Sequence, residues 1–324
     1  MIKRELVSTI IPVFNRPRMI VEAVESVLGQ SHRPIEIIIV DDGSSDETPE
    51  VLAELARRSD CITVVRTDNQ GPGRARETGR SLARGELIQY LDSDDILLPA
   101  KFERQAAALR ENPECGACYG WTRYRHADGR VEPRPWKGSG RRVETMFPSF
   151  LESRWWDTPT PLYRKRVCDA AGPWSNLRLE EDWEYDCRVA ATGVALAYVE
   201  EFVAEVRDHE SGRLCRGTAL DASRLATRAR AHFLILESAL RAGIAPETPE
   251  RQHFARELFL LARQCAAAGL KSETWNLLDG ARVATGKAGR RWDINLYQTL
   301  SRLIGTSTIG RLATWSDRFR ITTR

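Results

Sequence analysis

The sequence predicts an α/β fold in which a mostly parallel sheet is flanked by helices, followed by an all-helical C-terminal region. Over the N-terminal third, short apolar runs rich in β-branched residues alternate with segments of helical periodicity. The strand-like runs are almost continuously apolar, as expected for parallel strands that helices cover on both faces. From about Ala219 onward only helical periodicity is found. These observations predict two domains, at 1–218 and 219–324.

Four strands, each followed by a helix, are expected at the start of the chain. Pro17 stands where the first turn of a helix tolerates proline, and Ser45 or Asp46 is a candidate cap for the second helix. A Gly-Pro-Gly sequence opens the third helix. The strands are expected at 6–13, 35–40, 62–66 and 86–91, and the helices at 17–28, 47–58, 71–83 and 102–111.

The second half of this domain has a less regular pattern. Apolar residues predict strands on either side of a turn at Asp128 and Gly129. A segment rich in Pro, Gly, Arg and Trp is expected to be mostly loop, and a helix with Trp183 and Cys187 on one face precedes the last strands. The expected ranges are 118–125 and 131–133 for strands, 134–160 for the loop with a short helix near 144–152, 180–192 for the helix and 194–206 for the last strands.

The C-terminal region is helical and basic. The whole chain carries a net charge of +3, which gives no general attraction to nucleic acid. Residues 1–220 hold 31 Lys and Arg against 36 Asp and Glu, whereas residues 221–324 hold 17 against 9. The second region therefore suits an anionic partner. Its helices are expected at 222–242, 249–268, 271–285 and 292–316.

The segment 290–320 combines arginines with leucines and tryptophans. A helix of this composition can lie on an anionic membrane surface. More often such a helix covers its own domain or a partner subunit, so peripheral membrane contact and a homodimer both stay open. The residues concerned are Arg290, Arg291, Trp292, Ile294, Leu296, Leu300, Arg302, Leu303, Arg311, Leu312, Trp315, Arg318 and Arg320.

Cysteine usage and hydropathy bear on the location of the protein. The seven cysteines are an odd number without the spacing of a disulfide framework, which favours a reduced compartment. No stretch has the run of apolar residues that a membrane span needs, and the first strand begins without the pattern of a signal peptide. We therefore expect a cytoplasmic protein, with peripheral contact at the inner face of the membrane as an alternative.

An acidic group directly follows the fourth apolar run. Asp92 and Asp94 are two residues apart, so on an extended backbone they point to the same side. Two like charges held together favour a cation between them, and oxygen ligands of this kind suit Mg²⁺ or Mn²⁺ that share a phosphate. The alternative, equally frequent for such a sequence taken alone, is a solvated acidic turn that caps the next helix.

Polar residues follow three of the four predicted strands. They are Asn15, Asp41 with its neighbour Asp42, and the acidic group at 92–95. In open parallel sheets, ligands bind beyond the carboxyl ends of the strands. Three such ends with a Gly-Pro-Gly helix start between them are hard to explain as turns alone, and they predict a binding site at this edge.

The order and spacing of these motifs resemble those of family-two inverting glycosyltransferases with the GT-A fold, a Rossmann-like architecture. The resemblance covers residues 5–215. It implies a nucleotide-sugar donor, which we expect to be UDP-linked, a Mn²⁺ or Mg²⁺ cofactor, and a carbohydrate, lipid-linked or small-molecule acceptor. The role implied is synthesis of a cell-surface polysaccharide, glycolipid or glycosylated metabolite. The motifs are Ile10-Ile11-Pro12-Val13-Phe14-Asn15, Val40-Asp41-Asp42-Gly43-Ser44-Ser45-Asp46, Asn69-Gln70-Gly71 with Ala75-Arg76, and Leu91-Asp92-Ser93-Asp94-Asp95.

The resemblance also implies roles for single residues. Asp94 would bind the metal, and His209 would complete its coordination or contact the diphosphate, unless it is structural. Asp95 is expected to cap a helix, and Asp42 and Asp46 to brace their turn. The family often has Asn near Arg76 or Glu77, and this departure leaves the contact there open. The donor site would be formed by Pro12, Phe14, Asn15, Asp41, Gly73, Arg76, Asp92 and Ser93.

A second acidic group, with Glu181 and Asp182, lies ninety residues beyond the first. Acids at a helix start normally compensate the helix dipole. Here they resemble the Glu-Asp signature of the family, in which the Asp is the general base. An inverting displacement needs a carboxylate to take the proton of the acceptor hydroxyl. Asp182 is therefore the expected base, and Glu181 would steady the site or bind acceptor.

The segment before this signature is the candidate acceptor region. Trp156 and Asp157 resemble residues that precede the base in this family, and an exposed tryptophan stacks well on a sugar ring. Plain core packing is an equally good explanation of the tryptophan. Both residues are retained as candidate acceptor contacts.

Two other functions compete with a glycosyltransferase. A sugar nucleotidyltransferase has a similar sheet but needs a glycine-rich basic loop after the first strand, and residues 13–17 have no such loop. A non-catalytic nucleotide-sugar binding protein would not need Asp92, Asp94 and Asp182 together. The sequence therefore favours the enzyme.

Overall fold

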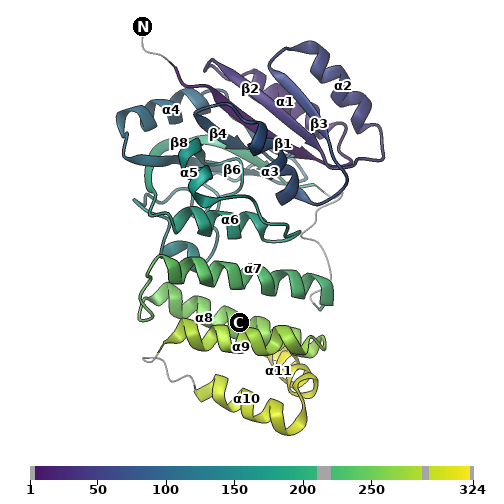
Figure 1. Ribbon diagram of the computed structural model, residues 1–324, viewed down its shortest axis with the longest axis vertical. Helices are drawn as coiled ribbons and strands as arrows, with labels where there is room; N and C mark the ends of the chain where they lie inside the picture. The colour runs from purple at the N-terminus through teal and green to yellow at the C-terminus, as the bar shows by residue number, and fades with distance from the viewer. Residues whose placement is uncertain (1–3, 210–219, 287–291, 322–324) are drawn as a thin grey trace. The chain divides into compact units, whose positions relative to one another are not determined.

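The computed structural model describes residues 4–209, 220–286 and 292–321, with side chains up to residue 314 in the last segment (Figure 1). The chain forms two compact units, one of Met1–Met146 with Arg154–Arg213 and one of Phe147–Ser153 with Leu214–Arg324. The predicted domain boundary at 218 falls within 210–219, outside the described residues, and stays a prediction.

The first unit is built on one sheet, which within the described residues has eight strands in the order β3-β2-β1-β4-β7-β6-β8-β5. The pairs β3–β2, β2–β1, β1–β4 and β6–β8 are parallel, whereas β7 and β5 pair antiparallel with their neighbours. The predicted mostly parallel sheet is confirmed. The strands are β1 Val7–Val13, β2 Ile35–Asp41, β3 Ile62–Arg66, β4 Leu87–Tyr90, β5 Ile96–Leu97, β6 Cys115–Arg125, β7 Leu162–Arg164 and β8 Ala195–Arg207.

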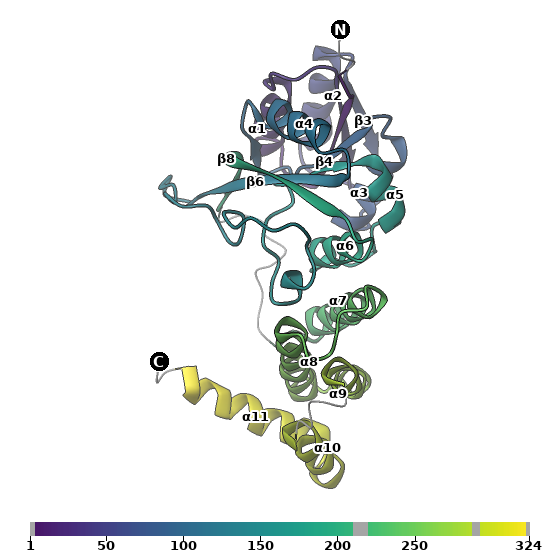
Figure 2. The same ribbon diagram turned by 90° about the vertical axis from the view of Figure 1, so that its left-hand side faces the viewer.

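Helices cover both faces of this sheet. The main apolar core lies where α1, α2 and α4 meet the strands, and Figure 2 shows α1 and α4 together on one side of β6 with α6 on the other. On the opposite face α3 packs tightly on β1, because a Cβ added at Gly79 would lie 2.4 Å from Ile10. The helices of this unit are α1 Met19–Leu28, α2 Thr48–Arg58, α3 Pro72–Leu82, α4 Lys101–Glu111, α5 Lys165–Ala171 and α6 Glu181–Ala190. The 3₁₀ turn η1 Ser149–Leu151 belongs to the second unit.

The second unit is helical, as predicted. Its helices are α7 Ala222–Arg241, α8 Pro249–Ala267, α9 Lys271–Thr285, α10 Trp292–Ile304 and α11 Thr306–Ile321. The single helix predicted over 292–316 is wrong. Gly305 adopts φ +90°, a left-handed conformation that glycine tolerates and that ends α10 before α11 begins. Over the described residues, no helix is both long and apolar enough to cross a membrane.

Two local predictions also differ from the structure. The strand expected at 131–133 is reduced to an isolated bridge between Arg125 and Val131. The strands expected at 194–206 are one long strand, β8 Ala195–Arg207, which is irregular where its register against β6 shifts. Asp46 does accept a hydrogen bond from the first residue of α2, with its Oδ1 3.0 Å from the Thr48 backbone nitrogen. It therefore braces that turn as expected.

Candidate active site

The carboxyl ends of three adjacent parallel strands meet at one edge of the sheet. In the register Val13 lies opposite Asp41, and Ile10 lies opposite Tyr90. Asn15, which follows β1, accepts a hydrogen bond at Oδ1 from the Ser45 backbone nitrogen at 2.8 Å, which ties it to the loop after β2. The polar residues that follow these strands therefore gather as the sequence predicts.

Asp41 has a buried carboxylate that is only partly satisfied. Its Oδ1 accepts a hydrogen bond from the Ser44 backbone nitrogen at 2.9 Å. Within the described part of the chain its Oδ2 has no hydrogen-bond partner, and it forms an ion pair with Arg66 Nη1 at 3.5 Å. A buried carboxylate oxygen without a donor is costly, so this atom is suited to a hydroxyl or N–H of a ligand.

The residues next to Asp41 differ in burial: some are fixed inside the fold, and one is exposed to solvent. Asp42 accepts hydrogen bonds from the backbone nitrogens of Gln70 and Gly71, both at 2.8 Å, and so fixes the start of α3. Pro12 is buried inside β1, whereas the Phe14 side chain is 44 % exposed. The exposed ring of Phe14 is thus available to a ligand at this edge.

Asp94 and His209 come together after β4 and β8. His209 Nε2 lies 2.7 Å from Asp94 Oδ2, and Arg16 Nη1 lies 2.8 Å from the same oxygen. Arg16 also donates to the buried Ser93 hydroxyl at 3.4 Å. Burial opposes ionisation of Asp94, but His209 and Arg16 outweigh it and lower the pKa of this carboxyl. Sequence analysis did not find Arg16, although its position directly after Asn15 was the available signal.

The Asp94 and His209 pair fits part of a divalent metal site. Among the residues that the structure describes, His209 Nδ1 is buried without a hydrogen-bond partner, and Nε2 contacts Asp94. Over the residues that the structure describes, no group of three or more His, Cys, Asp or Glu side chains is arranged around a metal position. Mg²⁺ commonly takes one or two protein ligands and completes its coordination with water and substrate phosphate. The pair meets that requirement only with a phosphate ligand present.

Arg76 joins the two acidic motifs. Its guanidinium is buried and lies 2.5 Å from Asp92 Oδ1 through Nη2 and 2.8 Å from Glu181 Oε1 through Nη1. It also lies over the Trp174 ring, 4.8 Å from the centroid. Residues on α3, after β4 and on α6 are thus fixed by one cation.

The adjacent Glu181 and Asp182 experience opposite environments. Burial, together with the charge of Asp182, raises the pKa of Glu181 to about 7 although Arg76 opposes the rise. Burial also disfavours the charged form of Asp182, but Arg154, Arg76 and Lys137 outweigh it and lower its pKa. The Asp182 side chain remains 31 % exposed. A pair of carboxyl groups with pKa values driven apart is typical of acid and base assignments in active sites.

Arg154 was missed by sequence analysis. It lies in the loop before β7, and its Nη1 is 2.5 Å from Asp182 Oδ2 while its Nε is 2.7 Å from Asp186 Oδ2. Asp182 and Asp186 lie one helical turn apart, and two acids at this spacing on one helix face were the only available signal. The arginine itself stands in a loop without periodicity.

Two sequence-based roles are wrong. Trp156 is fully buried and its ring packs on Tyr119 at 4.9 Å between centroids, so it cannot stack on an acceptor sugar. Asp95 does not cap a helix, because β5 follows it and α4 begins only at Lys101. Burial and the nearby Asp94, Asp92 and Asp157 raise the pKa of Asp95 well above its usual value.

Asp157 stays a candidate acceptor contact. Its Oδ1 lies 2.5 Å from Lys137 Nζ, and its side chain is 19 % exposed. The lysine forms an ion pair with this carboxylate. The negative charge of Asp157 also contributes to the raised pKa of Asp95.

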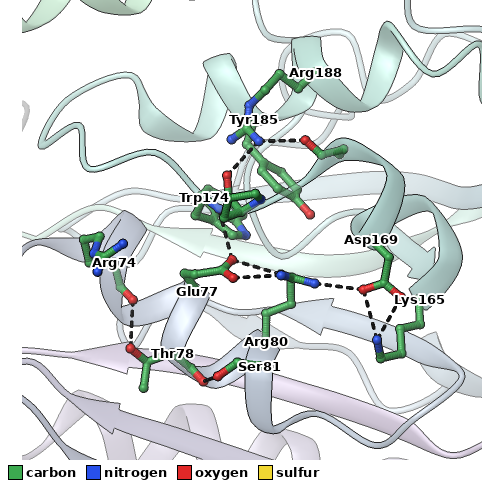
Figure 3. Close-up of polar contacts among 12 residues, drawn as sticks. Arg74, Glu77, Thr78, Arg80, Ser81, Lys165, Asp169, Trp174, Tyr185 and Arg188 are labelled. Atoms are coloured by element: carbon green, nitrogen blue, oxygen red, sulfur yellow. Dashed lines mark hydrogen bonds and ion pairs between the residues drawn. The ribbon is translucent and has the colours of Figure 1, made fainter.

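Glu77 explains the departure from the family pattern beside Arg76. It binds Arg80 through both carboxylate oxygens, at 2.7 and 2.9 Å, and accepts from the Trp174 backbone nitrogen at 3.0 Å. Arg80 also donates a hydrogen bond to Asp169 on α5 at 2.8 Å, as Figure 3 shows. Glu77 therefore braces α3 against the segment between α5 and α6.

A polar cavity opens beside the start of α3. Its volume is about 630 Å³, and its lining side chains are all hydrogen-bond donors or amides. The wall is fixed closely, because a Cβ at Gly73 would lie 2.2 Å from the Ser175 carbonyl oxygen. In Figure 3 the guanidinium of Arg74 has no dashed contact to the residues drawn. The cavity suits an anionic group. It is lined by Gln70, Arg74, Asn176 and Arg178.

Comparison with known families agrees with this geometry. The model of the family described as glycosyl transferase family 2 matches residues 8–165, from β1 through β7. Just under half of the chain therefore resembles glycosyl transferase family 2. A Rickettsia felis protein named as an uncharacterized glycosyltransferase is 43 % identical over 106 residues, which are 33 % of this chain and 17 % of that protein. Glycosyltransferase GlyG of Streptococcus pneumoniae is 33 % identical over 126 residues, 39 % of this chain and 42 % of that protein. The match thus spans less than half the length of these relatives.

Solved structures show the same fold over nearly the whole chain. Staphylococcus aureus TarS 1–349, in complex with UDP-GlcNAc, has a TM-score of 0.70 at 17 % identity and covers 96 % of this chain and 92 % of that one. The mannosyltransferase PcManGT from Pyrobaculum calidifontis, in complex with GDP-Man and Mn²⁺, has a TM-score of 0.53 at 18 % identity, with 96 % and 85 % covered. The predicted GT-A fold is confirmed.

Proposed function

We propose that this chain is an inverting glycosyltransferase that moves a sugar from a nucleotide-diphosphate sugar to an acceptor hydroxyl with the help of Mn²⁺ or Mg²⁺. The observation that carries the proposal is the ion bridge of Arg76, which brings Asp92 of the first acidic motif next to Glu181 and hence Asp182 of the second. On this proposal, donor-side and base-side residues that lie far apart in the sequence would form one site.

The chemistry follows from the position of each group. Asp182, ionised and partly exposed, accepts the proton of the acceptor hydroxyl as that oxygen attacks the anomeric carbon. Attack from the face opposite the departing nucleotide inverts the configuration. Asp94 and His209 would hold the metal, which when bound neutralises charge on the leaving diphosphate.

The donor would lie along the sheet edge. Asp41 Oδ2 would accept from the base or ribose, and the exposed ring of Phe14 would pack on the nucleotide. Asn15, Gly73 and Ser93 are further proposed donor contacts. TarS has been solved with UDP-GlcNAc and PcManGT with GDP-Man, so the fold accommodates either nucleotide. A UDP-sugar is our proposal for this chain. The cell-surface polysaccharide, glycolipid or metabolite role expected from the sequence is part of it.

We also propose that the second unit touches an anionic lipid surface through α10. Trp292, Leu296 and Leu303 lie on one side of this helix and are 73 %, 47 % and 74 % exposed. The opposite side, with Ile294 and Tyr297, is buried. The excess of 17 Lys and Arg over 9 Asp and Glu in 221–324 is complementary to anionic headgroups. A cytoplasmic location agrees with this proposal.

The catalytic proposal is tested by nucleotide release. Purified protein is incubated with UDP-sugars, Mn²⁺ and an acceptor panel, and UDP is measured for the wild type, Asp182→Asn and the control Asp169→Asn. Loss of general base catalysis lowers turnover by about 10²- to 10⁴-fold. Asp169 pairs with Arg80 and Lys165 at the surface, so its variant should resemble the wild type. Full activity of Asp182→Asn would remove the base assignment.

The two rival functions give different results in the same assay with pyrophosphate added. A sugar nucleotidyltransferase would form nucleoside triphosphate from donor and pyrophosphate, whereas a binding protein would bind donor without releasing UDP. Either outcome with the wild type would overturn the proposed transferase.

A further inference from the structure

Arg154 lies between the expected base and a second carboxylate on the same helix. Its guanidinium side chain is only 10 % exposed and contacts Asp182 and Asp186, one turn apart on α6. Nothing in the sequence motifs assigns a role to this arginine. The contact is nonetheless the shortest ion pair made by Asp182 among the described residues.

The far side of the Arg154 guanidinium is fixed by the core of the first unit. Asp186 is 2 % exposed at its side chain, and its second oxygen accepts from the Tyr163 hydroxyl at 2.8 Å. Tyr163 belongs to β7 and is buried. A chain of hydrogen bonds therefore runs from the sheet through Asp186 and Arg154 to Asp182.

At the other end of this series of hydrogen bonds, the Asp182 carboxylate is fixed in one orientation. Its Oδ2 accepts from Arg154 and its Oδ1 accepts from the Trp183 backbone nitrogen at 2.7 Å. Each carboxylate oxygen can accept a second hydrogen bond. A partly exposed carboxylate held at both oxygens can thus receive an acceptor hydroxyl without rotating.

Several charged groups face Asp182 from the elements around it. Glu181 and Asp186 on its own helix add negative charge, whereas Arg76 of α3 and Lys137 of the loop at 134–160 add positive charge. Lys137 is already paired with Asp157, and Arg76 with Asp92 and Glu181. Among these cations, Arg154 alone makes an ion pair with Asp182 in the described structure. Without it, the carboxylates of Asp182 and Asp186, one turn apart on α6, would repel each other.

We propose that Arg154 is a positioning residue that holds Asp182 oriented and ionised as the general base. This inference rests on the proposed function and adds a residue to it. The ion pair joins Arg154 to Asp182 itself, so the effect of Arg154 on turnover passes through that carboxylate. An arginine suits the task because its planar fork binds two carboxylates at once, which a lysine does not do.

The experiment follows the carboxyl group of Asp182 directly. Protein labelled with ¹³C at the aspartate carboxyl carbons is titrated by NMR, and the Asp182 signal is assigned by its absence in Asp182→Asn. In Arg154→Met the pKa of Asp182 should rise by at least one unit. Arg188→Met is the matched control, because Arg188 also pairs with a buried α6 acid, Glu184, on another side of the helix. There the Asp182 titration should be unchanged.

Turnover supplies the second measurement. In Arg154→Met, kcat at neutral pH should fall about 10- to 100-fold with KM for the donor little changed, as expected when a reacting group is displaced. The acid limb of the pH profile should move upward with the pKa of Asp182. Arg154→Lys keeps the positive charge and replaces the Met variant if that variant does not fold. In Arg154→Lys the pKa of Asp182 should change little, while kcat should still fall.

An unchanged Asp182 titration in Arg154→Met, or an unchanged kcat in both Arg154 variants, would overturn the inference. A wild type that binds donor but transfers no sugar would instead contradict the proposed function. The NMR titration would still report on the ion pair in that case, so the two failures are distinguishable.

Discussion

Arg76 and Glu181, 105 residues apart in the sequence, form a buried ion pair at 2.8 Å between α3 and α6. Because the same guanidinium also binds Asp92, the pair fixes the distance between the two acidic motifs. Breaking a buried ion pair by removing one partner leaves a charge without compensation, which typically costs about 3–5 kcal/mol.

The first prediction concerns this arginine. Arg76→Met should lower the free energy of unfolding by roughly 3 kcal/mol or more, measured by urea denaturation. The control Arg57→Met breaks an exposed pair with Glu54 and should cost at most about 1 kcal/mol. Equal losses for the two variants would mean that Arg76 contributes no more than a surface contact.

Glu181 predicts a pH dependence of stability. Its pKa in the folded protein is about 7, above the ordinary value of 4.5, so the folded state binds this proton more tightly than the unfolded chain does. The contribution is fully present below pH 4.5 and is lost as pH rises through 7. Since one pKa unit corresponds to about 1.4 kcal/mol, Glu181→Gln should remove a decline on the order of 2–3 kcal/mol between pH 5 and pH 8.

Denaturation at a series of pH values checks this prediction. The variant's stability should fall less than that of the wild type toward pH 8, whereas Glu54→Gln, at an exposed site, should follow the wild type. Parallel curves for Glu181→Gln and the wild type would contradict the raised pKa.

The strand-end residues were predictable because their pattern is local. An apolar run that ends in a polar residue identifies the edge of the sheet, and Asn15, Asp41 and Asp94 lie there. Arg154 and Arg16 were not predictable, since an arginine in a loop shows no periodicity and its partner is set by tertiary packing. Trp156 failed for the same reason: a tryptophan in a segment rich in proline and glycine carries no signal of which way it faces.

The pair of Asp94 and His209 predicts a metal response. Mn²⁺ binding, measured by titration calorimetry in the presence of UDP, should weaken in both Asp94→Asn and His209→Ala. The loss should exceed the about 10- to 100-fold that removal of an outer partner costs. Asp169→Asn, on α5, is the control and should bind as the wild type does. Unchanged Mn²⁺ affinity in both variants would show that the metal is held elsewhere.

Gly73 predicts a steric requirement at the start of α3. An added Cβ would lie 2.2 Å from the Ser175 backbone oxygen, so Gly73→Ala must displace the loop that lines the polar cavity. We expect a loss of about 1–3 kcal/mol in stability and weaker donor binding. Gly280→Ala is the matched helical control, because the nearest atom is the Phe233 ring at 3.2 Å and alanine favours the helix. A Gly73→Ala variant as stable as Gly280→Ala would refute the close packing.

The exposed side of α10 predicts lipid binding. The wild type should co-sediment with phosphatidylglycerol vesicles and much less with phosphatidylcholine vesicles, because both apolar insertion and basic charge contribute. Leu303→Glu should reduce the bound fraction at least about tenfold, since it places a charge on the apolar side of the helix. Val283→Glu, at a 51 % exposed position on α9, is the matched control and should have little effect. A different result would be a wild type that does not bind vesicles but whose molecular mass doubles as its concentration rises. If Leu303→Glu then prevents this doubling, a second copy of the chain covers this face instead.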